Sequence, residues 1–189
     1  MTTAQFLDKK VRWITTGGQY DWTAKCYPVG PPPPFPRDLQ RLVEGIFPMK
    51  AEAAITNIYS AGDTLAVHRD VSEECQRPLV SISLGCEGIF VVGLDDGADA
   101  SSEGAESGKD VRMQAIRLRS GDALLMSGPA RFAWHGLPKV VPDSCPEWLR
   151  EWPAVGGGEK RFEKWKEWMG GKRINFNVRQ MFDGDVVGT

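Results

Sequence analysis

Histidine is scarce in this chain of 189 residues, which contains only His68 and His135. A site that needs three histidine ligands, such as that of a tri-histidine zinc hydrase, is therefore excluded, whereas a two-histidine metal site or a Ser-His-Asp triad is not. A large excess of positive charge is also absent, because 23 lysine and arginine residues face 25 aspartate and glutamate residues. The net charge of -2 argues against binding of nucleic acid through the overall field, but it leaves room for a local basic patch.

Closely spaced cysteines and long apolar runs are missing as well. The four cysteines are Cys26, Cys75, Cys86 and Cys145, and none of them forms a Cys-x-x-Cys pair, which argues against a zinc ribbon or a thioredoxin motif. The sequence has no apolar signal segment at its beginning and no run of 18 apolar residues. We therefore expect reduced thiols and an intracellular protein without membrane contact, in a nucleus, cytoplasm or mitochondrion that the sequence does not distinguish.

Short strands dominate the pattern from residue 53 onward, where β-branched and apolar runs alternate with turn signals. The expected strands are 53–60, 64–68, 78–84, 89–94, 113–119, 122–127, 131–137 and 173–181. Because these runs do not alternate with helices, the sequence predicts a mainly β fold, in which a sandwich, a jelly roll and a barrel are the options.

The remaining segments are expected to surround this core as parts of one domain, 1–189. An aromatic-rich start is followed by the extended proline run 31–34 and by an amphipathic supporting helix from Pro36. The core, 51–181, carries two inserts. Residues 95–110 form an acidic loop rich in glycine, alanine and serine. Residues 142–171 contain a helix, because Phe162, Trp165, Trp168 and Met169 recur at helical spacing.

The two histidines and one carboxylate form the strongest candidate site. His68 and Asp70 are two residues apart at a strand end, so both side chains point to the same side, and His135 lies near the end of another strand. Two histidines and a carboxylate are the facial triad of non-heme Fe(II) oxygenases. A chance His-x-Asp in a structural role is the alternative. A serine triad is disfavoured because no Gly-x-Ser-x-Gly occurs and Ser127, the nearest candidate, precedes no helix.

The last strand carries polar residues that point to an anionic ligand. Arg173, Asn175, Asn177 and Arg179 alternate with apolar residues and share one face, while the apolar residues need a core on the other face. Buried arginines are costly unless anions pair with them, and a dicarboxylate would supply those anions. On another strand, Asn57 and Tyr59 share a face and can add an amide and a hydroxyl, although an ordinary strand pair is the simpler interpretation.

Together these segments resemble the AlkB family of Fe(II)/2-oxoglutarate-dependent dioxygenases. The segments NIYSAGDTLAVHRD, SGPARFAWHG and RINFNVRQ carry the family's motifs in the family's order, over roughly residues 10–181, and VRWITTGGQYDW is similar to the eukaryotic AlkB homologue 1 branch. The resemblance implies a double-stranded β-helix (jelly-roll) core and Fe(II) bound by His68, Asp70 and His135. It also implies that 2-oxoglutarate is bound by Arg173 with Tyr59 and Asn175. Asn57 and Arg179 would contact the other end of the co-substrate or orient Asp70.

The resemblance further implies a nucleotide-recognition lid within residues 1–50, in which Trp13 stacks on the substrate base and Tyr20 and Trp22 line the lid. Core packing is the alternative for the tryptophans. Ser72 stands where bacterial members carry an acidic residue, which puts their base-reading contact in doubt here. Basic residues of the 142–171 insert and its border are expected to grip phosphate or simply to be solvated. They are Arg150, Lys160, Arg161, Lys164, Lys166 and Lys172.

The activity implied by the resemblance is oxidative demethylation of N6-methyladenine, N1-methyladenine or a related base in DNA or RNA. The substrate would be an unpaired or flipped base, and the enzyme a monomer. Two other functions are compatible with the residues. One is a 2-oxoglutarate oxygenase that acts on a protein or a small molecule, and the other is a β-sandwich binding module with vestigial ligands.

Overall fold

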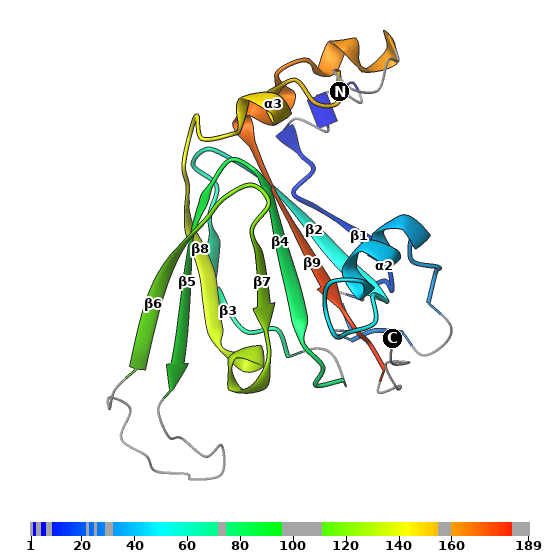
Figure 1. Cartoon of the computed structure of the whole chain (residues 1–189), viewed down its shortest axis with the longest axis vertical. Coiled ribbons are helices and arrows are strands. Elements are labelled where there is room, and N and C mark those ends of the chain that lie inside the picture. The colour runs from blue at the N-terminus through cyan, green and yellow to red at the C-terminus, as the bar shows by residue number, and fades with distance from the viewer. Residues whose placement is uncertain are drawn as a thin grey trace.

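The computed structural model describes residues 2, 5–6, 9–21, 23–24, 26–28, 32–71, 75–95, 111–154 and 160–182. Trp22, Ser72 and residues 96–110 of the acidic insert lie outside this part of the chain. Within it, two antiparallel sheets make up most of the structure, and the few helices lie at their edges (Figure 1). The prediction of a mainly β fold is therefore confirmed.

Nine strands build the two sheets. In spatial order, the first sheet consists of β1 (Trp13–Gly17), β2 (Ala53–Ser60), β9 (Lys172–Arg179), β4 (Leu79–Gly85) and β7 (Ala123–Met126), and the second of β3 (Leu65–His68), β8 (Trp134–Val140), β5 (Gly88–Asp95) and β6 (Val111–Leu118). From β2 to β9 the chain changes sheet at almost every step, so strands remote in sequence become neighbours. Most of the expected strands are found with end residues shifted by one or two positions.

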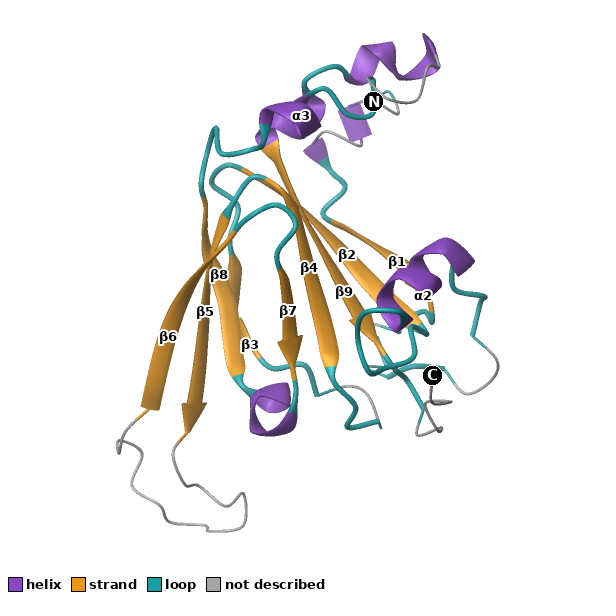
Figure 2. Ribbon diagram, viewed as in Figure 1, coloured by secondary structure: helices purple, strands orange, loops and turns teal. Residues whose placement is uncertain are grey.

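Apolar residues pack on both faces of the first sheet. Its inner face and the second sheet enclose a core that includes Leu79, Phe90, Leu118, Met126 and Leu137. Its outer face is covered by the helix α2 (Arg37–Glu44), which begins directly after Pro36, as expected (Figure 2). In this outer cluster Val43 packs with Val80 and Val178, all three fully buried. Strand β9 is therefore buried on both sides, which means that its polar face cannot be solvated.

Three expectations about local structure were wrong. Residues 13–17 form the edge strand β1, paired with β2, where only an aromatic-rich segment was expected. Residues 128–132 form a 3-10 helix, η1, so β8 begins at Trp134. The 142–171 insert contains a short helix α3 (Glu147–Arg150) and two 3-10 helices, η2 (Lys160–Trp165) and η3 (Trp168–Gly171), in place of one continuous helix. Glu167 has a left-handed φ of 62°, which interrupts the helical backbone between η2 and η3.

The described helices are too short to cross a membrane: the search for an apolar helix of at least 18 residues finds none among them.

Candidate active site

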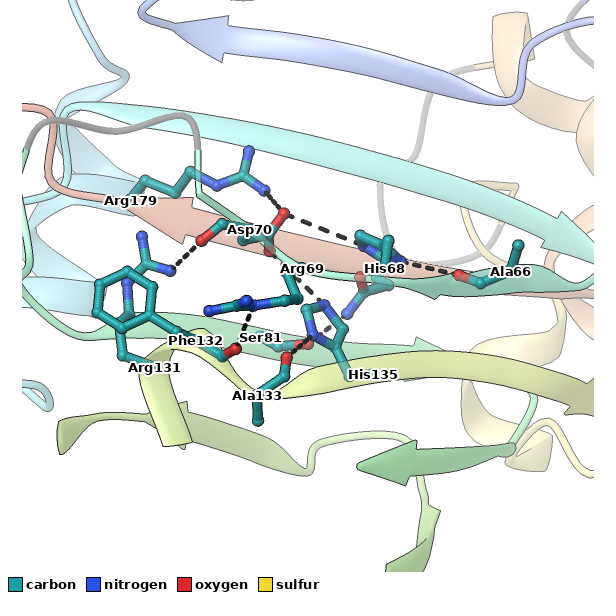
Figure 3. Close-up of polar contacts among 11 residues, drawn as sticks. Ala66, His68, Arg69, Asp70, Ser81, Arg131, Phe132, Ala133, His135 and Arg179 are labelled. Atoms are coloured by element: carbon teal, nitrogen blue, oxygen red, sulfur yellow. Dashed lines mark hydrogen bonds and ion pairs between the residues drawn. The ribbon is translucent and has the colours of Figure 1, made fainter. Parts of the chain in front are cut away.

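The two histidines meet at the paired ends of β3 and β8. His68 and His135 are register partners in this antiparallel pair, and their ring centroids are 4.4 Å apart. Asp70 follows β3 by two residues and places one carboxylate oxygen 4.0 Å from Nε2 of His68 and the other 3.7 Å from Nε2 of His135. One donor atom from each residue lies within 4.8 Å of the others (Figure 3). The predicted His-x-Asp…His group is thus brought together in space.

Hydrogen bonds to the backbone set the direction of both rings. Nδ1 of His68 donates to the carbonyl oxygen of Ala66 at 2.9 Å, and Nδ1 of His135 donates to that of Ala133 at 3.0 Å. A carbonyl oxygen can only accept, so each Nδ1 carries the proton and each Nε2 keeps its lone pair for a metal ion. Burial lowers the pKa of His135 below its ordinary value, which favours the neutral ring that a metal requires.

The Asp70 carboxylate is ionised and incompletely satisfied. Burial by itself would raise its pKa, but the charge and the hydrogen bond of the Arg179 guanidinium hold the pKa below the ordinary value. Arg179 donates to Oδ1 at 2.9 Å, while the buried Oδ2 has no hydrogen-bond partner. A buried acceptor without a partner is costly, and a cation between the three side chains would satisfy it. The donor set therefore fits a divalent metal held by two imidazoles and one carboxylate.

A second buried arginine, which the sequence did not single out, holds the backbone of Asp70. Arg131 donates through Nη1 to the carbonyl oxygen of Asp70 at 2.8 Å (Figure 3). Its Nε donates to the carbonyl oxygen of Arg77 at 3.0 Å. Only 2% of Arg131 is exposed. Arg179 thus orients the side chain of Asp70 and Arg131 its main chain. Arg131 was expected inside a strand, and nothing in the residue pattern marks it as a contact of the metal-binding group.

A cavity extends from His135 between the two sheets. Its lining includes Tyr59, Leu65, Leu79, Ser81, Phe90, Leu118, Met126, His135, Gly136, Leu137, Arg173, Asn175 and Asn177. The predicted polar face of β9 thus contributes three of its alternating polar residues, Arg173, Asn175 and Asn177, to one cavity. Ser81 was missed, although the alternation of Ser81 and Ser83 in β4 could have indicated that polar groups face inward there.

Arg173 is the most deeply buried charge in this cavity. Its side chain is 1% exposed; Nη2 donates to Oγ of Ser83 at 2.9 Å and Nη1 to the carbonyl oxygen of Cys86 at 3.4 Å. Nε has no hydrogen-bond partner, and no carboxylate of the described residues forms an ion pair with this guanidinium. Burial lowers the pKa of Arg173. Gly88 makes room for it, since a Cβ there would lie 2.8 Å from Nε of Arg173. The described residues around Arg173 thus leave its guanidinium without a negatively charged partner.

Neighbouring groups can add hydrogen bonds to such an anion. Tyr59 lies directly across from Arg173, and burial raises the pKa of its phenol to about 12, so the hydroxyl keeps its proton and can donate. Asn175 donates to Oγ of Ser81 at 2.6 Å. Asn57 faces Asn175 across the strands, but it does not line the cavity.

Two of the predicted substrate residues, Trp13 and Tyr20, are among the described residues. Trp13 is the register partner of Asn57, so it lies on the inner side of the sheet, on the edge strand, with 45% of its surface exposed. Tyr20 contacts Tyr27 edge-on, with ring centroids 5.3 Å apart. Trp13 thus borders the cavity side of the sheet.

Comparison with known proteins decides the family. The sequence model of the 2OG-Fe(II) oxygenase superfamily matches residues 1–179. The chain belongs to this superfamily. Within it, the chain is an AlkB-type oxygenase: it is 47% identical over 184 residues to the "N6-methyladenosine RNA demethylase ALKBH" of Cryphonectria parasitica, with 97% of this chain and 81% of that protein covered. It is also 50% identical to the "N6-methyladenosine RNA demethylase ALKB1" of Pyricularia oryzae, with 96% and 51% covered.

More distant proteins agree with this assignment. The chain is 32% identical to the human "Nucleic acid dioxygenase ALKBH1", with 94% of this chain and 48% of that protein covered. It thus spans about half the length of the human and Pyricularia proteins. The solved structure of OsALKBH1 has the same fold, with a TM-score of 0.65 at 20% identity, and the match covers 89% of this chain and 77% of that one. The resemblance to the AlkB homologue 1 branch is confirmed.

The AlkB-type oxygenase uses Fe(II) and 2-oxoglutarate, and its residues fit both. The two imidazoles and the ionised Asp70 suit the metal ion, and the buried Arg173, which has no carboxylate partner among the described residues, suits a dicarboxylate.

Proposed function

We propose that this oxygenase oxidatively demethylates N-methylated nucleobases, and that N6-methyladenosine in RNA is its principal substrate. The observation that carries the proposal is one cavity with two unsatisfied ends. At one end the metal-binding group has a buried acceptor without a hydrogen-bond partner. At the other end Arg173 has no carboxylate partner among the described residues. The substrate is proposed from the relatives, since two fungal proteins that are 47% and 50% identical to this chain over 184 aligned residues are N6-methyladenosine RNA demethylases by name.

The roles of the residues follow from their contacts. His68, Asp70 and His135 would hold Fe(II), and Arg173 would bind the distal carboxylate of 2-oxoglutarate with the Tyr59 hydroxyl and the Asn175 amide. When bound, Fe(II) and 2-oxoglutarate would supply O2-dependent hydroxylation of the methyl carbon, which is then lost as formaldehyde. Apolar walls such as Leu79 and Phe90 keep bulk water out of the cavity.

Supporting residues complete the proposed site. Arg179 would orient Asp70 and so fulfil one of the two roles expected of it, and Asn57 would support Asn175 from β2. Trp13 would stack on the methylated base from the sheet edge, as part of a lid to which Tyr20 and Trp22 also belong, and Ser72 would be a substrate residue outside the lid.

The architecture also supports a finer assignment. We propose that the two sheets form a double-stranded β-helix and that 1–189 acts as one catalytic unit and as a monomer, inside the cell. The strand orders β2-β9-β4-β7 and β3-β8-β5-β6 support the β-helix, because the first and last strands of the core are neighbours within one sheet.

The test is a substrate panel with chemical readouts. The protein is incubated with Fe(II), 2-oxoglutarate and oligonucleotides that carry N6-methyladenine, N1-methyladenine or N3-methylcytosine, as single-stranded RNA, single-stranded DNA, duplex and tRNA. We expect formaldehyde and loss of one methyl mass from N6-methyladenosine RNA, and neither with His135→Ala. Turnover of 2-oxoglutarate without a change in any nucleic acid would refute the proposal and favour a protein or small-molecule substrate.

A further inference from the structure

A second cavity lies on the opposite side of the first sheet, between β2 and the 142–171 insert. It has about 560 Å³ of empty space and is almost entirely apolar, with the lining residues Ile58, Trp152, Pro153, Phe162, Trp165 and Trp168. Ile58 alternates along β2 with Asn57 and Tyr59, so its side chain leaves the sheet on the face away from the active-site cavity. We call this cavity the insert pocket. Four of its six lining residues are aromatic.

The rings form a corner with one polar group that lacks a partner. The indoles of Trp165 and Trp168 have centroids 6.3 Å apart and planes at 83° to each other. Nε1 of Trp168 is buried and has no hydrogen-bond partner. A buried N–H without an acceptor is unfavourable, and indole N–H groups at binding surfaces usually find one. The aromatic corner of the insert pocket therefore suits a flat apolar group.

Two lysines place positive charge on the same rings. Nζ of Lys164 lies 5.6 Å from the ring centroid of Trp165, and Nζ of Lys172 lies 5.6 Å from that of Trp168. No carboxylate is among the lining residues of the insert pocket. Aromatic faces for stacking beside cations for the backbone are the elements with which proteins bind unpaired nucleic acid. An apolar peptide would not use the lysines.

We propose that the insert pocket binds an unpaired nucleobase of the substrate strand, at a nucleotide other than the methylated one, with a neighbouring phosphate near Lys164. This inference rests on the proposed function for its ligand class. Strands β2 and β9 carry both sites on opposite faces, with Tyr59 beside Ile58 and Arg173 beside Lys172. A strand bound at both sites has to pass round a sheet edge, so the insert pocket contributes only to oligonucleotides long enough to reach it.

Binding without turnover tests this proposal. Fluorescence anisotropy measures the affinity of the whole chain for unmethylated single-stranded RNA of about 12 nucleotides and of about 4 nucleotides, which bracket the usual site sizes. Trp165→Leu keeps apolar bulk but removes the flat face. Trp148→Leu is the matched control, because Trp148 lies in α3 of the same insert, is 76% exposed and does not line the insert pocket.

We expect Trp165→Leu to weaken binding of the longer RNA by about 5- to 150-fold, the cost of one lost base stack. The ratio of the affinity for the longer RNA to the affinity for the shorter RNA should fall as well. The control should stay within about twofold of wild type, a change of less than about 0.5 kcal/mol. Thermal unfolding of both variants establishes that the insert is intact. Lys164→Gln leaves every lining residue in place and should weaken binding of the longer RNA in a salt-dependent way.

Three outcomes would overturn or separate the proposals. Equal RNA affinity of Trp165→Leu and Trp148→Leu would overturn the insert pocket as a nucleic-acid site. A wild-type dimer that Trp165→Leu converts to monomer in sedimentation would overturn it too, since a second copy then occupies the pocket. A length-dependent loss in Trp165→Leu, without demethylation of any substrate by wild type, would support the pocket and refute only the proposed reaction.

Discussion

Replacement of Arg173 by methionine should separate the co-substrate from the metal. Methionine keeps most of the buried volume of the side chain and removes its charge and all its donors. Arg173 is 1% exposed and has no carboxylate partner among the described residues, so a bound 2-oxoglutarate carboxylate would be its counter-ion. Loss of one partner of a buried ion pair costs about 3–5 kcal/mol. The dissociation constant of 2-oxoglutarate should therefore rise by about 150- to 5,000-fold.

This magnitude can be measured as a thermal shift with redox-inert Mn(II) in place of Fe(II). At 2-oxoglutarate concentrations about 100 times the wild-type Kd, binding stabilises the folded state by about 2.7 kcal/mol. For a domain of this size such a gain raises Tm by about 5–11 °C. In Arg173→Met the same concentration is at or below the new Kd, which leaves at most about 0.4 kcal/mol, or a Tm shift below about 2 °C.

The control is the Mn(II) shift in the absence of 2-oxoglutarate, which Arg173→Met should keep because its contacts are with Ser83 and Cys86 and not with the metal-binding group. A full 2-oxoglutarate shift in the variant would refute the role of Arg173. Loss of the Mn(II) shift as well would show that Arg173 acts on the fold.

Four further perturbations test the surroundings of these two ends. Gly88→Ala brings a Cβ to 2.8 Å from the Arg173 guanidinium, so calorimetry should show 2-oxoglutarate binding weakened by about 5- to 150-fold, the cost of overpacking; an unchanged Kd would contradict the contact. Tyr59→Phe removes one hydroxyl donor to a charged ligand and should weaken binding of 2-oxoglutarate by about 10- to 150-fold without changing the affinity for Mn(II). Arg131→Met should lower Mn(II) affinity by about 10- to 100-fold through Asp70, with partial recovery in Arg131→Lys, and equal affinity in all three proteins would exclude a positioning role. Burial lowers the pKa of His135, so the unfolded chain binds its proton more readily; the metal-free protein should lose stability as pH falls through about 6.5, and His135→Gln should flatten that slope in thermal unfolding.

Strand alternation explains why so much of the core was predictable. Period-2 patterns in segments such as 53–60 and 173–181 leave a strand as the one regular structure that buries their apolar residues, and the structure has β2 and β9 there. β1 escaped because Thr15 and Thr16 interrupt its apolar residues, and its pairing with β2 depends on tertiary contact. Local pattern thus predicts strands that have a buried face and misses a strand at the sheet edge.

The 142–171 insert shows how a correct pattern led to the wrong helix. Phe162, Trp165 and Trp168 follow a strict three-residue spacing, which is the period of a 3-10 helix, in which such side chains line up on one side. The structure has 3-10 helices there, and these three rings line one pocket. The spacing indicated one continuous helix with an apolar face, whereas the backbone is interrupted at Glu167 between two 3-10 helices.

The metal-binding group was predictable because the chain has only two histidines and because His68 and Asp70 are two residues apart. The residues that support this group were not predictable. His68, Asp70 and His135 could be selected from the sequence by ligand type and strand position. Arg131 acts on a backbone carbonyl oxygen, which every residue has, so only the folded positions of Asp70 and Arg77 reveal its role. Hydrogen bonds to the main chain carry no signature in residue types.

Strand β9 shows how folding prepares the site for its co-substrate. Two arginines on its inner face, six residues apart, are both almost fully buried, and each needs a negative charge. The protein supplies one of these charges, since Asp70 lies 2.9 Å from Arg179. It supplies none to Arg173 among the described residues, and Gly88 keeps the space beside that guanidinium open. Arg179 therefore has its counter-ion before co-substrate binds, while Arg173 has none among the described residues, which makes an anion at Arg173 a ligand that the fold requires.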